Sequence, residues 1–372
     1  MREDPVTVVL SILDRYVIRS FLVNYLISLT VLIAMYILID LFVNLDEFTK
    51  GDQPLVEVVA NIGNYYGYNL FLYFAQLSGV IILVAASFTL ARMQRANELT
   101  AILTSGTSLY RVATPVVALG LILNTLWIVD QEVIIPRIAH KLARPHGDVE
   151  GRRTYGVWFL NDRDNALVSA VKFFPNTQRM RRVVILQRDA SNTVTGIIMA
   201  DWATWNESKR VWELERGILL GAGEEQDGGF GQDVELGKNL VHAYPSDLTP
   251  KELILRQAAQ WINYMGISQL NALERRESSR RQAIAQVKHN RFTQPFVNMV
   301  LLMLGIPFFL NREPRNLLVN AALSLGVCSS CFVFSFLTQN VIGAAFHPAL
   351  PAWLPLIVFG PVAVALLDRI KT

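Results

Sequence analysis

Long apolar runs at both ends of the chain are the feature that most constrains its fold. A helix needs about 20 mostly apolar residues to cross the hydrocarbon core of a bilayer, because each residue adds only about 1.5 Å. Six segments meet or approach that length: 21–43, 70–90, 112–129, 292–310, 317–341 and 350–367. The fourth is the most diluted, by Gln294, Asn298 and a Gly-Ile-Pro break at 305–307. The pattern predicts an α-helical membrane protein with six transmembrane helices, three at each end of the chain.

The composition agrees with a membrane protein. Of the 372 residues, 52% are apolar and only 17% are charged, whereas charged residues make up about a quarter of an average soluble domain. The first apolar run is longer than the apolar region of a signal peptide, and no small-residue cleavage motif follows it. We therefore expect it to be a transmembrane span rather than a cleaved signal.

The distribution of basic residues predicts the orientation, because Lys and Arg accumulate in short cytoplasmic loops. One set of loops and termini holds Arg2, Arg15, Arg19, Arg92, Arg95, Arg111, Arg312, Arg315, Arg369 and Lys371. The opposite short loops hold only Lys50. We expect both termini in the cytoplasm and the polar middle, roughly 137–285, on the outer side of the membrane. This asymmetry accounts for the net charge of +3 without a nucleic-acid partner.

The polar middle consists of short β-rich pieces separated by turn residues. Strands are expected over 155–160, 166–174, 181–188, 193–205 and 210–221. Their length and short connections are typical of an antiparallel sandwich, barrel or jelly roll. In the last piece Trp212 and Leu214 alternate with charged neighbours, which predicts one buried and one wetted face. Periodicity does not decide whether the buried face is a filled core or a slot for a ligand, and a core is the default. Helix is expected over 249–292, with Thr249 as its N-cap.

Catalytic and metal-binding signatures do not emerge from the sequence. It has no P-loop, zinc signature or GxSxG elbow, and the glycine-rich run 222–233 opens no helix, so a hairpin tip is predicted there. Cys328 and Cys331 fall inside the fifth span without His or carboxylate neighbours. We interpret them as two small buried residues rather than a metal or redox pair. We expect a protein that is not an enzyme and holds no cofactor.

A short amphipathic helix is predicted between the second and third spans, over about 97–106. Asn97 is a candidate N-cap, and Gly106 is placed to end the helix. One face carries the apolar stripe Leu99, Ile102, Leu103 and Gly106. A helix this short is unstable alone, so the stripe needs a partner: lipid headgroups, the protein's own spans, or another protein. Because 97–108 holds no basic residue, lipid is disfavoured, and docking into a groove of a cytoplasmic protein is favoured.

Four stretches are distinctive together: ILDRYVIRSFL (12–22), NELTAILTSGTS (97–108), VIIPR (133–137) and HNRFTQPFVNMVLLMLGIPF (289–308). They resemble motifs of the permease family of lipopolysaccharide export, the LptF/LptG (YjgP/YjgQ) proteins. The order of three spans, an outer β domain and three spans also matches, so the resemblance covers essentially the whole chain. It implies an N-terminal membrane half (1–136), a β-jellyroll-like periplasmic domain with a trailing helical segment (137–285) and a C-terminal membrane half (286–372).

The resemblance implies a permease subunit of an ABC transporter in the bacterial inner membrane. Such a subunit pairs with a second permease of the family and with two copies of a cytoplasmic ATPase, which uses ATP and Mg. It extracts lipopolysaccharide, or a similar large amphipathic lipid, and passes it to a periplasmic bridge protein. The start LDRY leans towards the LptG side without deciding the paralogue. The alternative is a non-transport membrane receptor or assembly scaffold with a periplasmic β domain.

The resemblance also implies site residues. The short helix would be the coupling helix, with ATPase-docking residues Glu98, Leu99, Ile102, Leu103 and Gly106. Where some members carry Lys or Arg near the outer end of the first span, this chain has Asp40, Asp46 and Glu47, which puts direct phosphate contact there in doubt. An intramembrane carboxylate is a functional candidate, although Asp40 can also reach the interface. Substrate-path candidates are Tyr36, Asp40, Asn44, Phe332 and Phe336.

Overall fold

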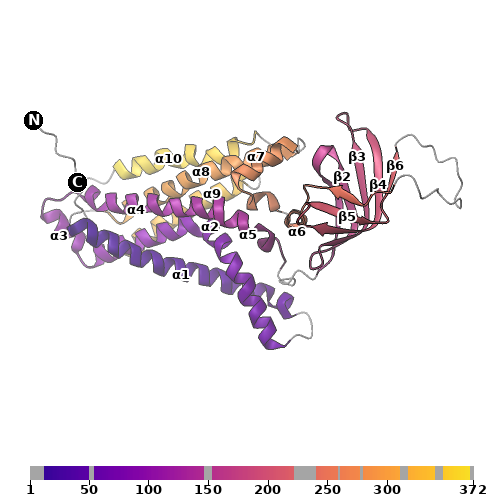
Figure 1. The fold of residues 1–372 in the computed structure, drawn as a ribbon. Helices are drawn as coiled ribbons and strands as arrows, with labels where there is room; N and C mark the ends of the chain where they lie inside the picture. Colours follow the sequence, from indigo (N-terminus) through magenta and orange to yellow (C-terminus); the bar gives the residue numbers. More distant parts are fainter. Residues whose placement is uncertain are drawn as a thin grey trace, which may run out of the picture. The chain divides into compact units, whose positions relative to one another are not determined.

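The computed structural model describes residues 12–49, 54–145, 153–221, 240–258, 260–276, 280–310, 317–339 and 347–368 (Figure 1). They belong to two compact units. The first is helical and draws on Met1–Val43, Asn69–Pro136 and Arg281–Thr372. The second, which contains the β-sheet, draws on Asn44–Tyr68 and Arg137–Arg280. Residues 44–68 thus belong to the second unit, whereas the sequence placed them with the N-terminal membrane half.

Five helical stretches of the described chain are long and apolar enough to cross a membrane. They are α1 (Ile12–Thr49), α2 (Leu55–Arg95), the stretch Leu109–Leu142, the Leu318–Leu337 part of α9 (Leu317–Leu337), and α10 (Leu350–Asp368). The stretch Leu109–Leu142 joins α4 (Leu109–Val129), a π-helix (Asp130–Ile134) and α5 (Ile135–Leu142). These helices contain four of the six predicted spans and the 318–337 part of a fifth, 317–341. Several extend well beyond the apolar run, because helical hydrogen bonding continues into polar sequence on either side.

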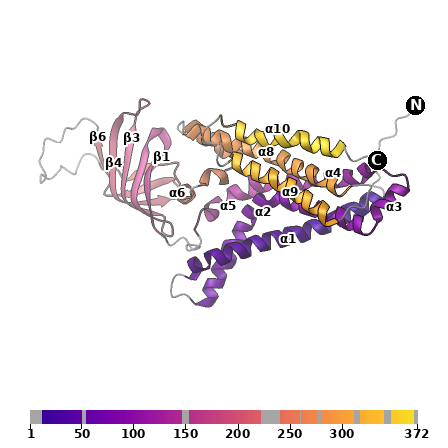
Figure 2. The ribbon, with the colours of Figure 1, turned by 180° about the vertical axis from the view of Figure 1, so that it is seen from behind.

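Helix α8 (Arg281–Gly305) covers most of the fourth predicted span but is not one of those five stretches. Arg291, Thr293 and Asn298 interrupt its apolar sequence, and all three are buried. Helix α8 packs against α4, α9 and α10, and both views show these helices running alongside one another (Figures 1 and 2). Because neighbouring helices cover its polar side chains, α8 can be buried without a continuous apolar surface. These buried polar residues are what makes the fourth predicted span the least apolar of the six.

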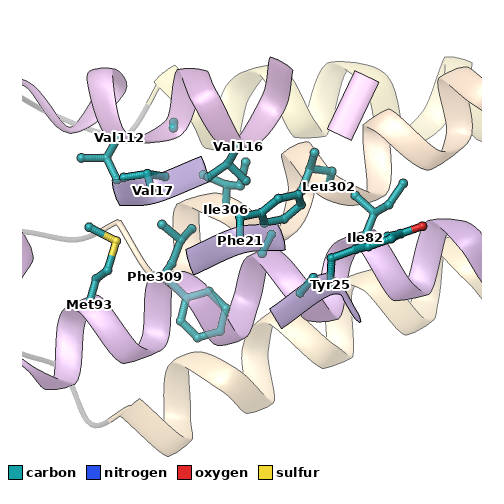
Figure 3. Close-up of a cluster of buried hydrophobic side chains, with 14 of the residues drawn as sticks. Val17, Phe21, Tyr25, Ile82, Met93, Val112, Val116, Leu302, Ile306 and Phe309 are labelled. Carbon is teal, nitrogen blue, oxygen red and sulfur yellow. The ribbon is translucent and has the colours of Figure 1, made fainter. Parts of the chain in front are cut away.

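The apolar core of the helical unit is formed by α1, α2, α4 and α8. Phe21, Ile82, Val116 and Leu302 are among its buried side chains (Figure 3). Gly120 allows close helix approach, because a Cβ there would lie 2.6 Å from Leu302 Cδ2 and that side chain would have to shift. Among membrane helices such packing is stabilised by van der Waals contact, since lipid is as apolar as the side chains.

The second unit contains one antiparallel sheet. Its strands are β1 (Tyr155–Asn161), β2 (Leu167–Phe174), β3 (Arg179–Arg188), β4 (Val194–Asn206), β5 (Val211–Glu215), β6 (Ile218–Gly221) and β7 (Ala243–Pro245). The order is β1-β2-β3-β4-β5-β7, and β6 pairs with β4. The antiparallel prediction is confirmed. Helices α6 (Pro250–Gln257) and α7 (Ile267–Arg276) follow the sheet, and the side chain of Thr249 caps α6 as predicted by accepting from the Glu252 N–H.

The prediction of one strand over 210–221 is wrong, because β5 and β6 are separate. Arg216 takes a positive φ of 55°, and a Cβ on Gly217 would collide with the carbonyl of Val241. Strand β5 therefore ends at Glu215, and β6 begins at Ile218. Strand β5 pairs with the second half of β4, and β6 pairs with its first half.

The inward face of the sheet is a filled aromatic core near β5. Trp212 and Leu214 are buried while their charged neighbours are exposed, as the alternation predicted. The ring centroid of Trp212 lies 5.1 Å from that of Trp205 and 6.4 Å from that of Phe173. The Trp212 indole N–H donates to the Leu248 carbonyl at 3.0 Å. These contacts favour a core over a slot at this end. The glycine-rich run 222–233 lies outside the described residues.

The two cysteines of α9 are buried free thiols, as predicted. Cys328 is 2% exposed and Cys331 is fully buried. The Cys328 thiol donates to the Leu301 carbonyl of α8 at 3.8 Å. Both residues pack in a second apolar cluster between α8, α9 and α10.

Candidate functional site

Helix α3 (Glu98–Thr104) lies where the short helix was predicted, and its C-terminal end has the predicted geometry. Gly106 has a φ of 77°. The N–H groups of Gly106 and Thr107 donate to the carbonyls of Leu103 and Ile102. This pair of bonds is a Schellman motif, which only a left-handed residue can close without strain. The Ser108 side chain then caps α4 by accepting from the Tyr110 N–H at 3.2 Å.

The start of α3 differs from the prediction. Asn97 has a left-handed backbone with φ 58°, and its side chain makes no capping hydrogen bond. Helix α2 ends only two residues earlier, at Arg95, and the Asn97 N–H donates back to the Gln94 carbonyl. Asn97 nevertheless occupies the N-cap position of α3, since its carbonyl accepts from the Ala101 N–H at 3.1 Å, and Asn tolerates the left-handed region. The predicted position is confirmed, whereas the expected side-chain cap is not made.

The apolar stripe of α3 packs against the protein's own helices. Leu99 is 3% exposed and belongs to the core cluster of the helical unit, and Ile102 and Leu103 are half-buried against the same cluster. This is one of the three partners that the sequence left open, although docking to another protein was favoured. The stripe therefore anchors α3 to the helical unit. The exposed face of the helix carries Thr100, Ala101, Thr104 and Ser105.

Glu98 connects α3 to the first turns of α1. The Tyr16 hydroxyl donates to the Glu98 carboxylate and lies 2.9 Å from each of its oxygens. The sequence analysis missed Tyr16 as a site residue. It falls within the motif ILDRYVIRSFL, but no spacing relates it to a residue 82 positions later.

A buried polar network joins α8 to α2 and α4. The Asn298 side-chain amide donates to Ser78 Oγ and to Asn124 Oδ1, each at 3.1 Å. Asn124 in turn donates to the Pro295 carbonyl at 2.6 Å. Gly79 makes room for this network, because a Cβ there would lie 2.5 Å from Asn298 Oδ1. Asn298 was noted in the sequence only as a dilution of the span, and its role as a helix–helix contact was missed.

An ion pair lies one to two turns closer to the N-terminus of α8. Arg291 Nη1 lies 2.9 Å from Glu132 Oε1, and the two side chains are 7% and 26% exposed. Glu132 belongs to the π-helix, a geometry that is often found at functional sites. Its neighbour Asp130 is 2% exposed, and neither carboxylate oxygen has a hydrogen-bond partner in the described structure. These groups were also missed, although the nearby motifs VIIPR and HNRF were noted.

Two of the substrate-path candidates come together around one tyrosine of α2. The rings of Tyr36 and Tyr73 have centroids 4.5 Å apart, and the Tyr73 hydroxyl donates to Asp40 Oδ2 at 3.4 Å. Asn44, one turn further along α1, is the first residue of the second unit. Two others, Phe332 and Phe336, are exposed one turn apart on α9.

Apolar helices with buried polar contacts, together with a separate β-sheet unit, define a multi-pass membrane protein. The family model described as lipopolysaccharide export system permease LptF/LptG matches residues 15–369, nearly the whole chain. The chain therefore belongs to this family, whose members are transporter permeases rather than enzymes. The family resemblance of the sequence motifs is confirmed. A search of curated proteins finds no match.

Proposed function

We propose that the chain is the permease subunit of an ABC transporter that extracts lipopolysaccharide, or a similar large amphipathic lipid, from the inner membrane and passes it to a periplasmic bridge protein. The family match over residues 15–369 carries this proposal. The proposal includes a second permease of the same family and two copies of a cytoplasmic ATPase that uses ATP and Mg. It also includes α8 as the fourth of six spans, a jellyroll closure of the β domain in the periplasm, and cytoplasmic termini.

Helix α3 is the proposed coupling helix. Its contacts with the helical unit provide a route by which movement of the ATPase would reach the membrane helices. The ATPase would contact the exposed face, with Ala101 and Ser105 at its centre. Leu99 ties the opposite face to the core, while Glu98 is tied to Tyr16 of α1. A movement of α3 would therefore displace α1 directly. On this proposal the apolar stripe transmits the motion, and Gly106 ends the helix.

Co-purification tests the ATPase contact. The variant Ala101→Arg with Ser105→Arg adds bulk and charge to the exposed face without touching the buried stripe, so it should retain fold and lose the ATPase. Ala272→Arg, at an exposed position of α7, is the matched control and should leave recovery unchanged. A wild-type complex that contains no ATPase would contradict the proposal. Recovery of a different cytoplasmic partner would favour the receptor or scaffold alternative.

The proposed substrate path passes the Tyr36–Asp40–Tyr73 group. Asp40 is held by the Tyr73 hydroxyl within a largely apolar helix, and intramembrane carboxylates are costly unless they serve a function. Asp40→Asn keeps the hydrogen-bond acceptor and removes the charge, so it should reduce lipid export while leaving the complex assembled. Unchanged export would remove Asp40 from the path.

A further inference from the structure

A line of paired outward side chains crosses the β-sheet. Strands normally alternate inward and outward residues, but two consecutive residues are exposed or half-exposed at corresponding points of three neighbouring strands. They are Val171 and Lys172 in β2, Arg181 and Arg182 in β3, and Asp201 and Trp202 in β4. Lys172 pairs with Arg181, and Arg181 pairs with Trp202, so these residues form one row. The positive φ of Arg182, 51°, marks the irregularity in β3.

The row carries positive charge that the sheet does not neutralise. Two nearby acids already have partners, since Glu215 pairs with Arg179 at 2.5 Å and Asp201 pairs with Arg216 at 3.3 Å. Among the described residues no carboxylate lies within ion-pair distance of Lys172, Arg181 or Arg182. Lys172 and Arg181 are direct cross-strand neighbours, and like charges in that relation are destabilising. An anionic ligand would remove this repulsion.

Aromatic rings lie beside these cations. The guanidinium carbons of Arg179 and Arg181 lie 4.7 and 5.8 Å from the centroid of the Trp202 ring, at cation–π distance. At the other end, Trp158 is 69% exposed. Its indole lies against Gly156, where a Cβ would come within 2.8 Å of the ring nitrogen. Gly156 is opposite the pair at 171–172, because its neighbours in β1 pair with Phe173 and Ala170.

We propose that Trp158, Lys172, Arg181, Arg182 and Trp202 form a binding surface for the phosphorylated sugars of a lipid head group. Arg and Lys donate charge-assisted hydrogen bonds to phosphate oxygens, and the Arg fork can bind two oxygens at once. The flat faces of Trp rings accept the apolar C–H face of a sugar ring. The choice of a lipid head group rests on the proposed function, because an exported amphipathic lipid would bring such groups to this domain. The surface lies on the face opposite the aromatic core.

The test measures binding of a soluble probe to the full chain in detergent. Equilibrium dialysis would use a radiolabelled phosphorylated glucosamine disaccharide, the same disaccharide without phosphate, and inorganic phosphate. The phosphorylated disaccharide should bind more tightly than either of the other two, and its binding should weaken as salt rises. Lys172→Ala with Arg181→Ala should weaken it roughly tenfold or more, because two charge-assisted contacts are lost. Trp158→Ala should weaken the binding of both disaccharides.

The matched control is Lys209→Ala with Lys251→Ala, which removes two exposed positive charges elsewhere in the same unit. Circular dichroism verifies that every variant is folded. Equal binding of the two disaccharides, or binding by Lys172→Ala with Arg181→Ala within about twofold of wild type, would overturn the inference. The inference would also be overturned if Lys172→Ala with Arg181→Ala lost an acidic protein partner but still bound the disaccharide. Binding of the probe requires neither the ATPase nor export. If the probe does not bind, this inference fails and the export proposal stands. If the probe binds but the complex exports no lipid, only the export proposal is contradicted.

Discussion

The hydroxyl of Tyr16 in α1 and the carboxylate of Glu98 in α3 are joined by a hydrogen bond at 2.9 Å to each carboxylate oxygen. It connects the beginning of a long apolar helix to a seven-residue helix held to the core by Leu99. A helix of that length has little stability of its own. Its position therefore depends on these tertiary contacts, as the proposed coupling helix would require.

Removal of the Tyr16 hydroxyl should uncouple the two helices without unfolding the protein. Tyr16→Phe keeps the ring and loses one partly exposed hydrogen bond, so the free energy of unfolding should fall by no more than about 1 kcal/mol. Lipid-stimulated ATP hydrolysis of the reconstituted complex should fall much further than thermal stability does. Glu98→Gln, which retains an acceptor oxygen, should lose less activity than Glu98→Ala. Lipid-stimulated ATP hydrolysis by Tyr16→Phe at the wild-type rate would exclude a coupling role for this bond.

The Arg291–Glu132 pair should be among the most sensitive points of the helical unit. Breaking a fully buried ion pair costs about 3–5 kcal/mol, and a smaller cost is expected here because Glu132 is 26% exposed. Arg291→Met leaves the Glu132 carboxylate without this partner and should lower the melting temperature in detergent. Arg291→Met with Glu132→Met should recover much of that loss. Arg163→Ala is the control, because its pair with Asp164 is exposed and should contribute almost nothing. A double variant no more stable than Arg291→Met would show that the pair is not the cause.

The correct predictions came from features written locally in the chain. Apolar runs located five long helices, alternation identified the buried face of β5, and Gly106 marked the end of α3. What could not be predicted is which distant residues meet. Tyr16 and Glu98 are 82 residues apart, and Glu132 and Arg291 are 159 apart. No period or spacing encodes such pairs, because they depend on how whole helices pack.

The stripe on α3 shows the same limit. Its period gave the correct face, since Leu99 is buried and Thr100 and Ala101 are exposed. It did not give the partner, because an apolar stripe fits a groove of another protein as well as a groove between the protein's own helices. The sequence of α8 was ambiguous for a related reason. Buried polar groups such as Asn298 lower hydropathy in the same way as exposed ones do.

Gly79 and Asn298 should behave as a coupled pair. Gly79→Ala would force the Asn298 side chain to move, and overpacking of this kind costs about 1–3 kcal/mol. Asn298→Ala removes the obstacle and the hydrogen bonds, each worth about 0.6 kcal/mol between membrane helices. The double variant should therefore be more stable than the sum of the single effects, as measured by thermal unfolding in detergent.

Gly67 provides the control for that cycle. A Cβ on this residue of α2 meets no atom within 4 Å, so Gly67→Ala should be neutral or stabilising, since Ala is favoured over Gly in a helix by about 1 kcal/mol. It should also be additive with Asn298→Ala. Strict additivity of Gly79→Ala with Asn298→Ala would mean that the two side chains do not compete for the same space.

Tyr244 should make the β domain sensitive to alkali. Burial raises the pKa of its hydroxyl, and the negative charge of Asp162 raises it further. Because the folded-state pKa exceeds the unfolded value of about 10, the stabilising contribution is complete below pH 10 and decreases as pH rises towards the folded-state pKa. Tyr244→Phe removes the group that titrates. It should raise the midpoint of alkaline unfolding, followed by near-ultraviolet circular dichroism. An unchanged midpoint would mean that another group governs alkaline unfolding.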